Sequence, residues 1–189
     1  MFVIDTSADV TPSDIVYIRG FLGDVISNLP QNPDETKVSI LAYNTGTSGL
    51  VYFNTHQILD EVKYDLKTLN STGVTDAGHA LKLIATNVFD PNKRMRQYSA
   101  KSVVLITNDP SLDKTDAVHQ AAMLKASGIN VYAIGVGQSI DEVELKQIAS
   151  SPACSTFLKV SEYSKLEVLK EELLKLMCSG TSKLTELKG

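Results

Sequence analysis

The sequence has little of what zinc, nucleic-acid and membrane proteins usually need. Its 189 residues contain two cysteines and three histidines, and Cys154 and Cys178 do not have the spacing of a metal site. Lys and Arg number 18 against 22 Asp and Glu, with the two signs interspersed. No run of apolar residues approaches the roughly 18 of a membrane span. Nucleic-acid binding and membrane insertion are therefore disfavoured.

What the chain does contain is enough for one domain. Hydrophobic residues make up 43% of it and charged residues 21%, which is typical of a single globular core at this length. We expect the domain to cover residues 1–178, and residues 179–189 to form a linker or tail. The first apolar run begins at residue 2, with no signal peptide before it. We therefore interpret Met1 as the start of a domain cut from a longer chain.

Short β-branched segments alternate with helical patterns along the chain. Four segments predict buried strands: 2–5, 37–43, 102–107 and 130–136. Helical patterns lie at 12–29, 56–69, 76–89, 114–127, 140–149 and 163–177. One further short strand is predicted at 157–160. The four strands lack a period of two, as parallel strands covered on both faces do.

One segment predicts a different strand direction. Residues 50–53 follow the strand at 37–43 across a glycine-containing turn at 44–49, which favours an antiparallel hairpin at the edge of the sheet. The whole pattern predicts an α/β fold: a doubly wound, mostly parallel six-stranded sheet with one antiparallel edge strand and helices on both faces. Ligands bind such sheets at the carboxyl ends of the strands, where the winding reverses.

Oxygen-bearing side chains gather at those carboxyl ends. Asp5, Ser7 and Asp9 follow the first strand at alternate positions, so in an extended loop they can face one cation. Polar loops at 71–76 and 108–113 add oxygen but no sulfur or imidazole. This chemistry favours Mg²⁺, Mn²⁺ or Ca²⁺ over zinc. The alternative is that Ser7 or Asp9 caps the next helix and the other polar residues belong to turns.

Four stretches together resemble one family. FVIDTSAD resembles the first strand and DxSxS motif of von Willebrand factor type A domains, and LNSTGVTDAGHAL resembles their GGxTxTGxAL segment. VVLITND resembles their ITDG strand end, and INVYAIGVG followed by ELKQIASSP resembles their fifth strand and the helix after it. The resemblance covers residues 2 to about 177. Within the family it is closest in character to the A domains of extracellular matrix proteins such as collagen VI and the matrilins, or of invertebrate matrix proteins.

The resemblance implies a metal-ion-dependent adhesion site. Asp5 and Ser7 match its first two ligand positions and Thr75 matches its threonine. Asp9 stands where the family has serine, and Asn108 where it has aspartate, with Asp109 next to it. The number of carboxylates is thus unchanged, which indicates a remodelled site; two separate losses would look the same. Mg²⁺ is the cation expected first, with Ca²⁺ or Mn²⁺ as alternatives.

The resemblance also implies a function. It predicts a secreted, extracellular adhesion module, not an enzyme, that binds a matrix protein such as collagen and can self-associate through neighbouring domains. The alternative is a metal-independent module that assembles collagenous or mineralised matrix. A phosphotransferase of the haloacid dehalogenase type is disfavoured because Ser7 stands where that chemistry needs a second aspartate.

Two covalent features remain open. We expect Cys154, before the last strand, and Cys178, at the end of the last helix, to be neighbours and to form a disulfide. The alternatives are two unbonded thiols, or, as the resemblance to matrix A domains allows, a bond from Cys178 to a cysteine before residue 1. Asn70 begins the only N-glycosylation sequon, Asn-Ser-Thr.

Overall fold

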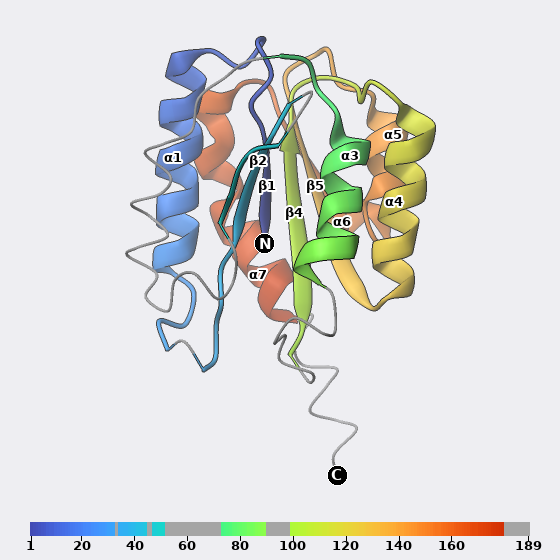
Figure 1. Ribbon diagram of the computed structural model, residues 1–189. Coiled ribbons are helices and arrows are strands. Elements are labelled where there is room, and N and C mark those ends of the chain that lie inside the picture. Colours follow the sequence, from blue (N-terminus) through green and yellow to red (C-terminus); the bar gives the residue numbers. More distant parts are fainter. Residues whose placement is uncertain (33, 45–46, 52–72, 90–98, 180–189) are drawn as a thin grey trace.

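A six-stranded sheet forms the centre of the molecule, with helices on both faces (Figure 1). The computed structural model describes residues 1–32, 34–44, 47–51, 73–89 and 99–179. The strands are β1 (Phe2–Asp5), β2 (Ile40–Tyr43), β3 (Thr47–Val51), β4 (Lys101–Thr107), β5 (Ile129–Val136) and β6 (Phe157–Val160). Their order in the sheet is β3-β2-β1-β4-β5-β6. All neighbours are parallel except β2 and β3, which are antiparallel.

The helices divide between the two faces of the sheet. They are α1 (Pro12–Ser27), α3 (Ala77–Leu83), the π-helical turn η2 (Ile84–Val88), α4 (Lys114–Ala126), α5 (Glu142–Ile148), the short α6 (Ala153–Thr156), the 3₁₀-helix η3 (Tyr163–Leu169) and α7 (Lys170–Ser179). One core lies under α1, η3 and α7, and the other under α3, α4 and α5. The predicted doubly wound α/β class is confirmed. No helix among the described residues is long and apolar enough to cross a membrane.

The β-branched runs form strands because each is covered on both faces. Residues 103–106 of β4 are fully buried, and alternate side chains enter the two cores. Val104 and Ile106 pack under α1, whereas Val103 and Leu105 pack under α3 and α4. A strand with two buried faces needs apolar residues at every position, which explains why no alternation was visible in the sequence.

Three predicted elements have different bounds or geometry. The strand expected at 37–43 is only Ile40–Tyr43, because β1 has four residues and pairs with four. The hairpin strand lies at 47–51 instead of 50–53, after a shorter turn. The last helix begins as 3₁₀, since Tyr163, Leu166 and Leu169 are buried at intervals of three residues. The helix predicted at 56–69 lies outside the described residues.

The edge of the sheet formed by the strand amino ends carries the two cysteines. Cys154 begins the segment before β6, and Cys178 lines a pocket with Met1 and Ser102. Both cysteines are exposed, and no disulfide joins them. The bond predicted between them is therefore not formed in the structure. Asn70 lies outside the described residues.

Candidate metal centre

The site is built around Asp5, the last residue of β1. The order of the sheet reverses between β1 and β4, so the chain crosses to opposite sides of this point, where sheets of this class bind ligands. Asp5 is fully buried. Its Oδ1 accepts from the Ser7 amide at 2.9 Å, and its Oδ2 accepts from Thr75 Oγ1 at 3.0 Å and Thr107 Oγ1 at 2.7 Å. Three donors therefore hold the carboxylate in one orientation.

Among the described residues, these three donors contact the Asp5 carboxylate and no cationic side chain pairs with it. None of the ion pairs among the described residues involves Asp5. Tyr43, whose hydroxyl is also buried, has its pKa raised by burial and then by the Asp5 charge. A buried carboxylate without a cationic partner is costly, and a bound cation is one way to offset that cost.

Two oxygen atoms in the same loops lack partners. Ser7 is 1% exposed, and its Oγ accepts or donates no hydrogen bond among the described residues. Asn108 Oδ1, directly after β4, is buried and equally unpaired within the described part of the chain. Buried oxygens of this kind are rare unless water or an ion satisfies them. Their chemistry suits a hard cation that prefers oxygen ligands, so the residues fit the implied metal.

The side chains of Ser7 and Asp9 are not used to cap α1, because Thr11 does so. Thr11 accepts from the Asp14 amide, and Asp14 accepts in return from the Thr11 amide at 2.9 Å. Pro12 occupies the first helical position, where its missing N–H costs nothing. The alternative that Ser7 or Asp9 caps this helix is therefore wrong.

Backbone hydrogen bonds join the three loops that carry the site. The Ala8 amide donates to Gly73 O at 2.8 Å, and the Leu112 amide donates to Thr75 O at 3.0 Å. Gly73 has a φ of 72°, in the left-handed region that glycine adopts without strain. The loops after β1, before α3 and after β4 therefore form one connected surface at the upper edge in Figure 1.

Two further carboxylates lie beside this surface. Asp9 is exposed and Asp109 is partly buried. The pKa of Asp109 is raised by burial first, then by the charges of Asp9 and Asp5. Negative charge is thus concentrated around Asp109, and a divalent cation would relieve the repulsion between its carboxylate and those of Asp9 and Asp5.

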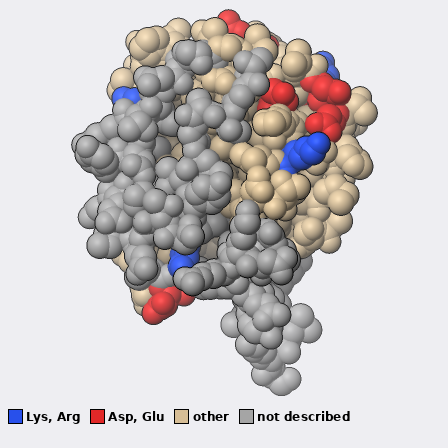
Figure 2. Space-filling view, viewed as in Figure 1, with Lys and Arg blue, Asp and Glu red and all other residues tan. Residues whose placement is uncertain are grey.

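More acidic residues surround the site at the starts of two helices. Asp76 caps α3, Asp113 caps α4, and Asp116 lies in the first turn of α4. Figure 2 shows Asp and Glu side chains gathered over the upper ends of these helices. No group of three or more His, Cys, Asp or Glu side chains in the described part of the chain could hold a metal alone. A cation here would therefore depend on hydroxyl and amide oxygens.

The structure brings most of the predicted residues together. Asp5, Ser7 and Thr75 are in direct contact or adjacent, Asn108 and Asp109 follow the end of β4, and Asp9 lies near Asp109. Sequence reasoning did not place Thr107 in this site, where it donates to Asp5 and accepts from the Asp109 amide. Its signal was its position as the last residue of a buried strand, beside Asn108. Sequence reasoning also missed Glu144, a buried acid on α5.

Fold and site together define a class: a doubly wound domain with a hydroxyl-rich oxygen site at the carboxyl edge of its sheet. The sequence model of the von Willebrand factor type A domain matches residues 1–172, and the chain belongs to this family. It is 29% identical over 183 residues to matrilin-1 of Gallus gallus, covering 94% of this chain and 36% of that protein. It is 31% identical over 180 residues to the collagen alpha-1(XX) chain of Homo sapiens, covering 94% of this chain and 14% of that protein.

Solved structures show the same fold. Proximal thread matrix protein 1 from the mussel byssus superposes with a TM-score of 0.86 at 23% identity, covering 94% of this chain and 46% of that one. A structure of that mussel protein with a zinc-occupied MIDAS motif superposes with a TM-score of 0.85 at 22% identity. The chain spans about a third or less of the length of the two curated relatives named above, and none of these proteins is named as an enzyme.

Proposed function

We propose that this domain is an extracellular matrix-interaction module that binds a divalent cation, Mg²⁺ first, and through it a matrix protein such as collagen. Its relatives include a matrilin, a collagen chain and a thread matrix protein, which supports the matrix assignment. The mussel protein has been solved with a zinc-occupied MIDAS motif, which supports cation binding here by analogy. An extracellular location follows from the same analogy.

The observation that carries the proposal is the unpaired Ser7 Oγ beside the anchored Asp5 carboxylate. Thr75 donates its proton to Asp5, so the lone pairs of its hydroxyl remain available for a cation. Ser7 and Thr75 would hold the ion, with Asp9, Asp109 or Asn108 completing its oxygen ligands. When bound, the cation would act as a Lewis acid and attract a carboxylate from the partner.

The negative side chains around the site affect how tightly it binds the cation and how strongly that cation attracts a partner's carboxylate. Neutral hydroxyl ligands leave a cation short of negative charge and receptive to a partner's carboxylate. Asp9 would supply part of that charge from within the chain, because it lies close enough to Asp109 to raise that residue's pKa. We therefore propose a site that holds its cation well and captures an external carboxylate less tightly than a site with serine at position 9.

A Ser7→Ala substitution tests the site with little effect on the fold. Ser7 Oγ makes no hydrogen bond within the described residues, so its removal leaves no partner unsatisfied. We expect Tm in EDTA to change by no more than about 1–2 °C. The stabilisation by Mg²⁺, about 2.7 kcal/mol at 100 times Kd, should be strongly reduced.

Thermal unfolding with and without Mg²⁺ gives both quantities. Ser13→Ala is the matched control, because Ser13 is an exposed serine in the first turn of α1, outside the three loops that carry the site. It should keep the full response to Mg²⁺. An equal stabilisation by Mg²⁺ in Ser7→Ala and the unsubstituted domain would overturn the proposed site, and no stabilisation of either would favour the metal-independent scaffold.

A further inference from the structure

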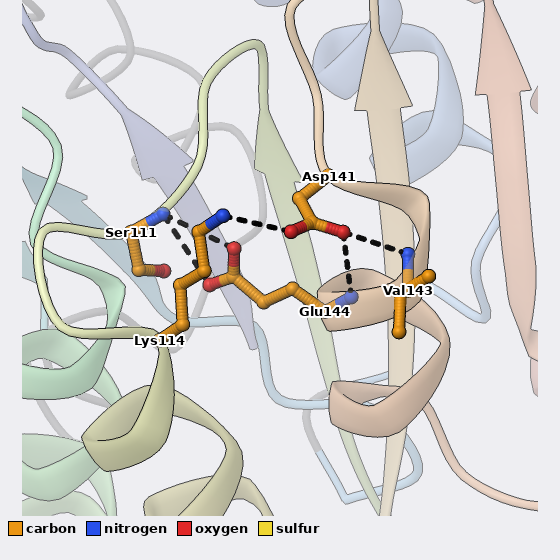
Figure 3. A network of polar contacts seen from close by, with 5 residues as sticks. All are labelled: Ser111, Lys114, Asp141, Val143 and Glu144. Carbon is orange, nitrogen blue, oxygen red and sulfur yellow. Dashed lines mark hydrogen bonds and ion pairs between the residues drawn. The ribbon is translucent and has the colours of Figure 1, made fainter.

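Glu144 is a buried carboxylate that contacts the loop carrying half of the candidate site. It lies in the first turn of α5 and is 3% exposed. Its Oε1 and Oε2 both accept from the Ser111 amide, each at 3.3 Å. Figure 3 shows the side chain reaching from α5 across to the loop after β4. Ser111 is itself buried, so this amide has little access to water.

The start of α5 is fixed in place by a second acid. Asp141 caps the helix by accepting from the Val143 amide at 2.9 Å and the Glu144 amide at 3.1 Å. The same carboxylate accepts from Lys114 Nζ at 2.8 Å, and Lys114 is the first residue of α4 (Figure 3). The base of the Glu144 side chain is therefore held by the cap, and its carboxylate is aimed at a defined point of the loop.

That loop has only a few attachments between β4 and α4. The Asp109 amide donates to Thr107 Oγ1 at 3.4 Å, and the Leu112 amide donates to Thr75 O at 3.0 Å. The contact of Glu144 with Ser111 lies between these two and comes from the opposite side, across β5. Asn108 and Asp109 lie in the chain between Thr107 and Ser111, so a displacement of Ser111 would change where their oxygens lie.

We propose that Glu144 is a positioning residue for the cation site, which acts by holding Ser111 and thereby favours Mg²⁺ over Ca²⁺. This inference rests on the proposed function. Without the contact, the buried Ser111 amide loses its acceptor and the loop moves to find another. Mg²⁺ requires nearly ideal octahedral ligands, whereas Ca²⁺ accepts variable ones, so a displaced loop weakens Mg²⁺ binding more.

Three substitutions separate the reach of the side chain from its charge. Glu144→Asp keeps the charge but withdraws the carboxylate by about 1.5 Å, one C–C bond. Glu144→Gln loses the charge but keeps an oxygen that can accept from Ser111. Glu144→Ala removes both. Glu142→Gln is the control, because Glu142 lies in the same helical turn but pairs with Lys146 and Lys159, away from the loop.

Calorimetric titration with Mg²⁺ and Ca²⁺ measures the effect. We expect Asp and Ala at position 144 to lower Mg²⁺ affinity roughly tenfold or more, as loss of a group orienting metal ligands typically does. The loss of Ca²⁺ affinity should be smaller, so the Mg²⁺/Ca²⁺ preference falls. The Glu144→Gln variant should keep most of the Mg²⁺ affinity, and the control Glu142→Gln should keep all of it.

Amide exchange in EDTA reports the contact without any cation. Exchange at Ser111 should be faster in the Asp and Ala variants than in the Gln variant. Absence of cation binding by the unsubstituted domain would overturn the proposed function and this inference together. Binding with unchanged affinity and preference in the Asp and Ala variants would overturn the inference alone. So would a Gln variant as weak as Ala, or an equal loss for both cations.

Discussion

At the scale of single residues, the site depends on where carboxylates are placed. Asp5 is buried and anchored by three donors, whereas Asp9 is exposed and Asp109 lies between these extremes. The raised pKa of Asp109 shows that its ionised form is disfavoured by burial and by the two other carboxylates. A cation reverses this balance, because it favours the ionised form of every carboxylate around it.

The exchange of residue types at positions 9 and 108 can be tested as a pair. We expect Asp9→Ser to weaken Mg²⁺ binding, because it removes a carboxylate. Asn108→Asp should tighten binding, because it adds a carboxylate at a buried, unpaired position. It should also lower Tm in EDTA, since four carboxylates, those at positions 5, 9, 108 and 109, then repel one another.

The double variant should keep cation binding close to that of the unsubstituted domain. Isothermal titration of the four proteins forms a double-mutant cycle, and compensation predicts an interaction of more than about 0.5 kcal/mol between the two positions. Strictly additive effects would show that the two residues do not compensate. Binding by the double variant alone would mean that the unsubstituted site has lost its cation.

At the scale of elements, close packing of two helices supports the site. α3 begins directly after Thr75 and Asp76, and it packs against α4. A Cβ on Gly78 would lie 2.7 Å from Asp116 Oδ2 and 3.1 Å from the Ala117 amide nitrogen. Asp116 also accepts from Gln120 at 2.9 Å, so its carboxylate cannot rotate away without losing that bond. Glycine lets α3 approach α4 and sets the position of Thr75.

Two glycine-to-alanine changes should therefore have opposite effects. Gly78→Ala should lower the free energy of unfolding by about 1–3 kcal/mol, because overpacking outweighs the better helix propensity. Gly20→Ala on α1 has open space around its Cβ and should raise it by about 0.5–1 kcal/mol. Urea unfolding in EDTA measures both. Stabilisation by Gly78→Ala would mean that α3 and α4 separate without cost.

At the scale of the whole molecule, the winding of the chain brings the loops of the site together. The two cores lie on opposite faces of one sheet, and the crossovers reverse direction between β1 and β4. The hydrogen bond from Thr107 to Asp5 spans this reversal and joins residues 102 positions apart. The candidate site is therefore a property of the completed fold, and any adhesion through it should depend on the cation.

Adhesion to collagen tests the complete domain. We expect binding to immobilised fibrillar collagen in Mg²⁺, with a loss of at least about tenfold in affinity in EDTA, as expected when a metal-bridged carboxylate is lost. Ser7→Ala in Mg²⁺ should bind as weakly as the unsubstituted domain in EDTA. Surface plasmon resonance measures both. Binding that is insensitive to EDTA would contradict the cation-dependent mechanism and support scaffolding.

Much of this protein follows from its sequence alone. Runs of β-branched residues predict the buried strands, and the helical pattern from residue 12 predicts where α1 begins. The spacing of Asp5 and Ser7, together with Thr75 in a second loop, predicts the location of the oxygen site. These features depend on local backbone preferences and on burial, and both can be read from neighbouring positions along the chain.

Tertiary structure decided the rest. The length of β2 depends on how many residues β1 offers as partners. The contacts of Thr107 with Asp5, and of Glu144 with Ser111, join segments 102 and 33 residues apart. Ser7 Oγ makes no hydrogen bond within the described residues, and Thr11, not Ser7, caps α1. Such contacts depend on which strands become neighbours, and spacing along one sequence does not contain that information.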